Sequence, residues 1–137
     1  MNREILFRGK SIKNGKWEHG YLYVHEPPLQ CLVPENYVAE KSKYYILKTA
    51  FADWNMIRQV EFTEVDPETV GQFTGLYDNS ETRIFEGDVV EYEEERGVVS
   101  FSEGSFWIDF DGWTNVMSEF NSQELEIIGN IHEKGDK

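Results

Sequence analysis

The sequence is poor in cysteine and in long apolar runs. Cys31 is the only cysteine among 137 residues, so no disulfide can form within the chain, which is usual in a reducing compartment. No apolar run approaches the roughly 20 residues that a membrane-spanning helix requires. The opening MNREILFRGK also lacks the apolar stretch of a secretory signal. We therefore expect a cytoplasmic protein that does not enter the membrane.

Residues that carry chemistry are scarce as well. The histidines are His19, His25 and His132, and none has the closely spaced cysteine or histidine partners of a zinc site. No nucleophile stands in a recognisable catalytic arrangement, and the glycines do not form a phosphate-binding loop. We therefore expect no resident metal or cofactor and no enzymatic activity.

Basic residues are scarce in one part of the chain only. The formal net charge is −13, yet residues 1–60 hold nine Lys and Arg against six Asp and Glu, whereas residues 61–137 hold four against twenty. The second part therefore repels nucleic-acid phosphates, and only the N-terminal cations suit them. Two interpretations of the acidic surface stay open: it keeps the protein soluble, or it attracts the basic part, within one chain or between copies.

Aromatic residues, by contrast, are plentiful at 15%, which favours strands over helices. The clearest hairpin joins residues 4–12 to residues 17–24, because Asn14 and Gly15 supply the positive φ angles of a tight type I′ turn. Alternation along the second strand places four side chains on one face: Trp17, His19, Tyr21 and Tyr23.

A second hairpin pairs residues 97–101 with residues 106–110 around Glu103-Gly104. In this register Phe101 lies opposite Phe106. We expect one apolar face that points into a common core, formed by Val99, Phe101, Phe106, Ile108 and Phe110. The opposite face carries Ser100, Trp107, Asp109 and Asp111.

The rest of the chain reads as short strands separated by turns. Residues 60–63 alternate as in a half-buried strand with Val60 and Phe62 on its apolar side, and Asp66 caps a helical turn that begins at Pro67. Further strands are predicted over 70–76, 83–85, 89–92 and 126–131, with short ones possible over 29–33 and 44–47 and a helical turn or loop over 50–58.

This pattern predicts a mostly β fold with less than about a quarter helix. We expect a small barrel with an N-terminal β-hairpin lobe, although a sandwich is compatible with the same strands. The hairpin and the variable region occupy residues 1–60, and the barrel region occupies residues 61–137. The two regions fold either separately or as one compact unit.

Four sequence blocks occur in a characteristic order: Arg3–Lys10, Val65–Leu76, Phe85–Val90 and Ile127–Glu133. Together they resemble the YopX family, whose members are encoded by phages and prophages. One departure is Asp78-Asn79-Ser80-Glu81, where the family usually carries Asn-Gly. The resemblance implies a bacterial host cell and a β-rich fold whose C-terminal part is SH3-like. It implies no particular activity, and fold analogy alone does not assign one.

The function we expect is that of a protein-interaction or assembly module, which binds a host or phage protein or a second copy of itself. The candidate partner-binding residues are Trp17, Tyr21, Trp107, Asp109 and Asp111. Two alternatives stay open: a nucleic-acid-associated small β-barrel, and an acidic decoy for the DNA-binding site of a host enzyme.

Overall fold

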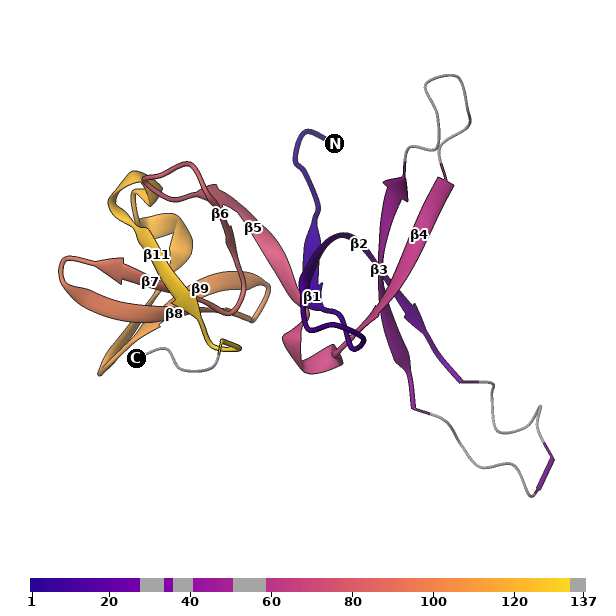
Figure 1. The fold of residues 1–137 in the computed structure, drawn as a ribbon. Helices are drawn as coiled ribbons and strands as arrows, with labels where there is room; N and C mark the ends of the chain where they lie inside the picture. The colour runs from indigo at the N-terminus through magenta and orange to yellow at the C-terminus, as the bar shows by residue number, and fades with distance from the viewer. Residues whose placement is uncertain (28–33, 36–40, 51–58, 134–137) are drawn as a thin grey trace. The chain divides into compact units, whose positions relative to one another are not determined.

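The computed structural model describes residues 1–27, 34–35, 41–50 and 59–133. The possible strand over 29–33 lies outside these residues, as does nearly all of the 50–58 segment. The chain divides into two compact units, one formed by Leu6–Val70 and the other by Met1–Ile5 with Gly71–Lys137. We name them the hairpin unit and the core unit (Figure 1).

Four antiparallel strands and one short turn make up the described part of the hairpin unit. They are β1 (Phe7–Lys10), β2 (Trp17–His25), β3 (Lys43–Ala50), β4 (Gln59–Val65) and the 3-10 turn η2 (Pro67–Thr69). The strands lie in the order β4-β3-β2-β1, so each pairs with its neighbour in sequence. The Asp66 side chain caps η2 by accepting a hydrogen bond from the Glu68 N–H at 3.1 Å, which confirms the predicted cap.

The β1–β2 hairpin is confirmed, but its predicted turn is wrong. The Ser11 N–H donates to the Lys16 carbonyl at 2.8 Å, which closes a longer loop over residues 12–15. Of the predicted Asn-Gly pair, only Gly15 has a positive φ, at 72°, whereas a type I′ turn needs two such residues. Asn14 instead stabilises the longer loop, because its Oδ1 accepts a hydrogen bond from the Lys16 N–H at 2.9 Å.

The sheet of the hairpin unit curls because two glycines lie on its inner face. Ser11, just after β1, forms a bridge with Val65 at the end of β4. A Cβ on Gly9 would lie only 2.8 Å from Val65 Cγ2, and a Cβ on Gly20 would fall on a backbone carbonyl oxygen of β3. The absence of these side chains lets the strands close over Val65, which is fully buried.

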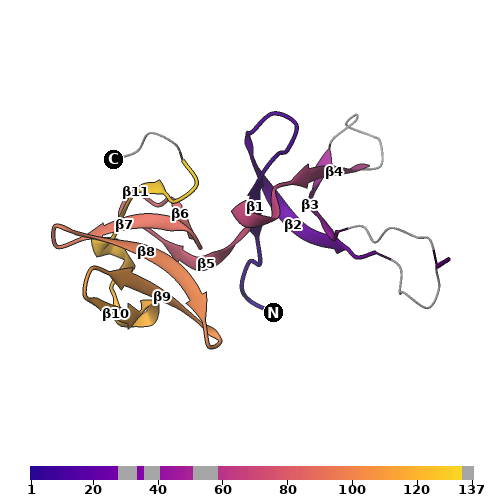
Figure 2. The same ribbon diagram turned by 90° about the horizontal axis from the view of Figure 1, so that it is seen from below.

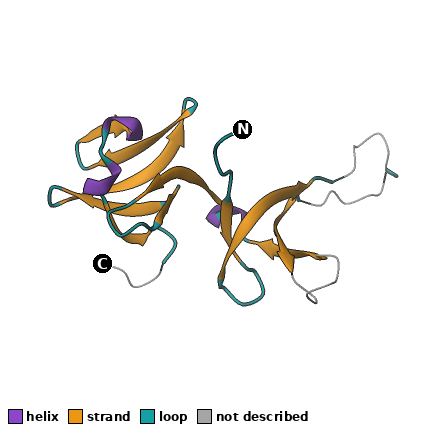
Figure 3. Cartoon of the chain, turned by 90° about the horizontal axis from the view of Figure 1, so that it is seen from above, coloured by secondary structure: helices purple, strands orange, loops and turns teal. Residues whose placement is uncertain are grey.

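The described core unit consists of a strand pair and a five-stranded antiparallel sheet. The pair is β5 (Gly71–Tyr77) with β6 (Arg83–Phe85). The sheet has the order β10-β9-β8-β7-β11, with β7 (Asp88–Tyr92), β8 (Glu95–Ser102), β9 (Ser105–Phe110), β10 (Trp113–Val116) and β11 (Glu126–Asn130). The 3-10 turns η3 (Met117–Glu119) and η4 (Ser122–Glu124) connect β10 to β11 (Figures 2 and 3). The predicted mostly β character is confirmed.

The predicted pairing of β8 with β9 is also confirmed. Phe101 lies opposite Phe106, as the alternation indicated. The turn between them is of the tight two-residue kind, because φ is positive at both central residues, 51° at Glu103 and 79° at Gly104.

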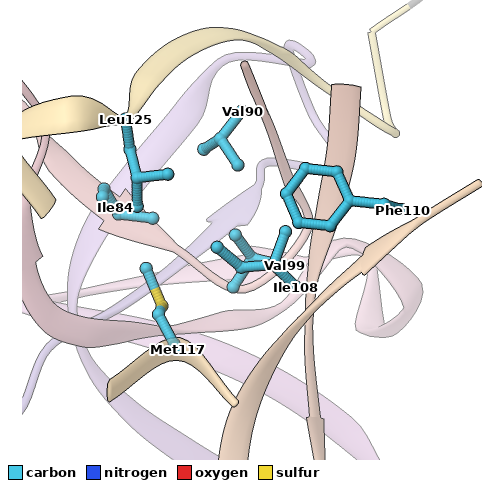
Figure 4. Packing of buried hydrophobic residues seen from close by; sticks show 7 residues of the cluster. All are labelled: Ile84, Val90, Val99, Ile108, Phe110, Met117 and Leu125. Atoms are coloured by element: carbon cyan, nitrogen blue, oxygen red, sulfur yellow. The ribbon is translucent and has the colours of Figure 1, made fainter. Parts of the chain in front are cut away.

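Seven buried side chains form the apolar cluster of the core unit (Figure 4): Ile84, Val90, Val99, Ile108, Phe110, Met117 and Leu125. Phe106 packs against this cluster, but Phe101 is 48% exposed, so its predicted place in the core is wrong. Phe101 lies beside the turn at the tip of the hairpin, and its ring packs edge-on against Phe106 with centroids 5.0 Å apart.

The predicted barrel is wrong, because the five-stranded sheet does not close. In the part of the chain that the structure describes, the edge strands β10 and β11 pair with β9 and β7 and not with each other. The segment that connects them crosses the apolar face instead. Its residues Met117 and Leu125 fill the core, in place of the side chains that a closed sheet would supply.

Candidate interaction surface

One face of the hairpin unit collects apolar side chains from three neighbouring strands. The register places Tyr21 of β2 beside Leu47 of β3, and Leu47 beside Phe62 of β4. Tyr23 lies opposite Tyr45 in the same way. Directly paired residues point to the same side of a sheet. We name this set the aromatic face: Tyr21, Tyr23, Tyr45, Leu47, Val60 and Phe62.

The aromatic face is open to solvent. Tyr21 is 63% exposed, Phe62 59% and Val60 53%. The rings of Tyr23, Tyr45 and Phe62 pack against one another, with centroids 6.1, 6.2 and 6.4 Å apart. The exposed side chains therefore form one contiguous patch, and contiguous apolar patches are typical of interaction sites.

The opposite face of the same sheet supplies the interior of the hairpin unit. Ile46 and Val65 are fully buried there. On the same side, Lys48 Nζ lies 2.7 Å from Glu18 Oε1, and this hydrogen bond raises the pKa of the Lys48 amine. The buried interior of the hairpin unit is therefore formed by the inner face, and the side chains of the aromatic face are not part of it.

The two candidate residues on β2 differ in how they are presented. Tyr21 is a member of the aromatic face, whereas Trp17 is half-buried. The Arg8 guanidinium lies 4.6 Å from the centre of the Trp17 ring, and the Lys10 amine lies 5.5 Å from it. These cation–π contacts hold two cations over the indole. The Trp17 ring is therefore partly covered by these cations, and Arg8 itself is buried.

The other three candidates, Trp107, Asp109 and Asp111, belong to the core unit. Trp107 and Asp109 lie on the face of β9 that points away from the apolar cluster. The Trp107 indole N–H donates to the Ser102 carbonyl at 2.9 Å, and the Ser100 hydroxyl donates to Asp109 Oδ2 at 2.8 Å. Strand β9 ends before Asp111, which is exposed in the turn that follows. Trp107 and Asp109 are therefore held by local hydrogen bonds.

The core unit also contains an open pocket of about 430 Å³. Its lining includes Leu76, Phe106, Met117 and Phe120, so it marks a point where the apolar cluster reaches the surface. Within the described ranges, no group of three His, Cys, Asp or Glu side chains is placed to hold a metal ion.

The sequence predicted only part of the aromatic face. The strand that contains Val60 and Phe62 is confirmed as β4, but the expectation that these side chains lie on a half-buried face is wrong, because both are more than half exposed. Tyr45 and Leu47 were not candidates at all. Both residues join the aromatic face through the pairing of β3 with β4. The segment between these strands has no hydrophobic pattern, so the sequence does not predict that pairing.

The described strands define a mostly β protein of open antiparallel sheets that presents an aromatic face. The family described as YopX protein matches residues 31–136, and the chain belongs to this family. The match confirms the resemblance carried by the sequence blocks, of which the first precedes the matched range. No curated protein matches the chain. Among the residues with described structure, no helix is long and apolar enough to cross a membrane.

Proposed function

We propose that this protein is an interaction module, encoded by a phage or prophage, that binds another protein in the bacterial cytoplasm through its aromatic face. The observation that carries the proposal is the exposure of Tyr21, Val60 and Phe62 on one face of paired strands. No part of the described hairpin unit covers these side chains.

The energetics of apolar burial support a protein partner. Removing an aromatic or large aliphatic side chain from water contributes about 1.5–3 kcal/mol, and tyrosine is enriched among the residues that dominate binding energy. A standard interface buries roughly 800 Å² on each partner. The six side chains of the aromatic face supply the apolar centre of such an interface, and Lys10, which is half-buried, supplies part of its charged border.

The core unit contributes charge to the proposal. Residues 71–137 hold four Lys and Arg against sixteen Asp and Glu, a balance that steers a basic partner and excludes acidic ones. We propose that Trp107, Asp109 and Asp111 form a secondary contact on this unit. We also propose an SH3-like strand arrangement for it, supported by its five short antiparallel strands.

Nucleic-acid binding is the weaker candidate. Single-stranded nucleic acids stack their bases on open aromatic rings flanked by cations, but Arg8 and Lys10 already lie over the Trp17 ring. The net charge of −13 also opposes phosphate binding. The acidic-decoy alternative is supported only by this same charge.

Affinity capture from a lysate of the bacterial host tests the proposal. The bait is used in three forms: the parent, the double variant Tyr21→Ser with Phe62→Ser, and the control Ile131→Ser. Ile131 is a matched control because it is 56% exposed and lies in the core unit. We expect the parent and the control to retain the same protein, and the double variant to retain at least about tenfold less of it.

Two further measurements identify the partner class. Light scattering at high and low salt reveals whether the partner is a second copy, and a mobility shift with single-stranded DNA tests the nucleic-acid alternative. Capture that is equal for all three baits would overturn the proposal, and a DNA shift abolished by the double variant would favour nucleic acid instead.

A further inference from the structure

The outer edge of β4 carries backbone groups that point away from the sheet. At one end of the strand, the Glu64 carbonyl accepts a hydrogen bond from the Ile12 N–H at 3.1 Å. Backbone groups alternate between the two sides of a strand. Val60 and Phe62 therefore direct their N–H and C=O groups to the same side as Glu64, away from β3.

The pairing that begins at this end of β4 does not continue along it. Ser11 bridges Val65 and Ile12 bonds to Glu64, after which the chain enters the hairpin loop. Among the described residues, no backbone group pairs with the outward N–H and C=O of Val60 or Phe62. An open edge of this kind allows another chain to add a strand.

A groove of about 560 Å³ lies between this edge and the hairpin loop. It is lined by residues 11–14 of the loop, by residues 62–64 of β4 and by Glu18. Ile12 is 60% exposed and Phe62 is 59% exposed, so the groove has apolar side chains on both sides. An extended segment laid in it would meet the free edge and an apolar site together.

We propose that β4 is a docking strand that accepts an extended segment of the partner protein as an additional strand of the sheet. This inference rests on the protein-interaction function proposed above and specifies its mode. The main chain of the partner bonds to the outward groups of Val60 and Phe62. Its alternate side chains pack on the aromatic face.

The charges along β4 point to a segment in which apolar and basic residues alternate. Glu61 is exposed on the face opposite to Phe62, where its cross-strand neighbour Lys48 is already bonded to Glu18. Glu64 lines the groove together with one cation, Lys13. A segment with apolar side chains toward Phe62 places its other side chains beside Glu61, where a basic residue is favourable. A second copy of β4 fits less well, because its own Glu61 and Glu64 would enter the same sheet as like charges.

The binding test uses a synthetic peptide of about nine alternating valine and lysine residues, a typical strand length. It is compared with two versions that are N-methylated on one or the other alternate set of amides, which keep the charge and the side chains but lose main-chain donors. Calorimetric titration should give a Kd at least about tenfold higher for one methylated version. Equal binding of all three peptides would overturn strand addition.

The protein variant Val60→Pro tests the same edge from the other side. Because the Val60 N–H points outward, proline there removes an edge donor without removing a hydrogen bond to β3. We expect peptide binding by Val60→Pro to be about tenfold weaker than binding by Val60→Thr, a matched control that also alters the Val60 side chain but keeps the N–H. If Val60→Pro does not fold, the methylated peptides still decide the question with the parent protein.

These results separate strand addition from the broader function. One outcome is that the peptide Kd is the same with and without methylation and for Val60→Pro, while the Tyr21→Ser, Phe62→Ser double variant still fails to capture the partner. In that case strand addition is wrong and the aromatic face remains the docking surface. If a valine–glutamate peptide binds as tightly as the valine–lysine peptide, the assignment of a basic partner segment is wrong. Tight binding of the valine–lysine peptide alone, lost on methylation, is the result that we expect.

Discussion

Asp78 and Ile127 are joined by a hydrogen bond, in which the Ile127 N–H donates to Asp78 Oδ2 at 3.1 Å. The other carboxylate oxygen accepts hydrogen bonds from the N–H groups of Ser80 and Thr82, each at 2.9 Å. Asp78 is only 2% exposed. One buried carboxylate therefore ties the turn after β5 to the last strand of the core unit.

Replacing Asp78 by asparagine should destabilise the core unit. The amide keeps the shape of the side chain, but it removes the charge and turns one of the two acceptors into a donor. Hydrogen bonds to a buried charged group contribute about 1.5–3 kcal/mol, so we expect a loss of about 2 kcal/mol or more in the free energy of unfolding. Urea unfolding at pH 7 measures it, and an unchanged midpoint would contradict the assignment.

The same carboxylate predicts a pH dependence. Burial raises the pKa of Asp78, but hydrogen bonds from the N–H groups of Ile127, Thr82 and Ser80 outweigh burial and lower the pKa below its ordinary value of 3.8. A pKa lower in the folded than in the unfolded state gives stability that is present above the unfolded value and is lost as the pH falls through the folded one. The stability gap between the parent and Asp78→Asn should therefore narrow below about pH 4. A difference in the free energy of unfolding that stays the same down to the lowest accessible pH would contradict the lowered pKa of Asp78.

The exposure of Phe101 predicts unequal effects of core substitutions on β8 and β9. Ile108 is fully buried, so Ile108→Ala should lower the free energy of unfolding by about 2–5 kcal/mol. Phe101 is about half exposed, so Phe101→Ala should lower it by only about 1 kcal/mol. Parallel denaturant titrations compare the two variants. Losses of equal size would mean that the core extends to the tip of the hairpin.

The curl of the hairpin unit predicts that Gly20 tolerates no side chain. A Cβ there would fall on the carbonyl oxygen of Leu47, whereas a Cβ on Gly15 meets open space but has φ at +72°. We expect Gly20→Ala to destabilise the unit by about 2–3 kcal/mol through steric overlap, and Gly15→Ala by about 1 kcal/mol through backbone strain alone. Thermal unfolding of both variants measures the difference. A smaller loss at Gly20 than at Gly15 would refute the curled sheet.

The turn between β7 and β8 predicts a stabilising change. Glu93 and Glu94 both have positive φ, at 50° and 68°, a conformation that favours asparagine and glycine. Glu93→Asn with Glu94→Gly should therefore raise the free energy of unfolding by about 1 kcal/mol. The double variant with glutamine at both positions is the matched control, because it removes the charges and keeps the strain. Equal stabilisation by the control would assign the gain to charge.

The sequence predicted the register of the β8–β9 hairpin because two independent signals agree there. The alternation of apolar residues and the Glu103-Gly104 turn select one register, and a shift by one residue would turn Asp109 toward the core. Alternation reports which face a residue occupies, but it does not report how far the core extends along a strand. For that reason the pairing of Phe101 was predictable and its exposure was not.

The aromatic face was only partly predictable because it is assembled by pairing across a segment without a pattern. Tyr21 could be read from the alternation of β2, but Tyr45 and Phe62 join it only through the register of β3 with β2 and β4. The barrel prediction failed for a related reason. Short strands indicate a β fold. They do not indicate that the segment between β10 and β11 contributes Met117 and Leu125 to the core, which a closed sheet would otherwise have to fill.

Photocrosslinking in living cells is the most direct test of the aromatic face as the protein-binding surface. Benzoylphenylalanine in place of Tyr23 or Phe62 reports what contacts the face, and the same group in place of Trp113, an aromatic residue of the core unit that is 40% exposed, is the control. The account predicts a covalent adduct with one and the same protein from Tyr23 and from Phe62, and none with that protein from Trp113. Adducts from Trp113 alone, with none from the aromatic face, would contradict it.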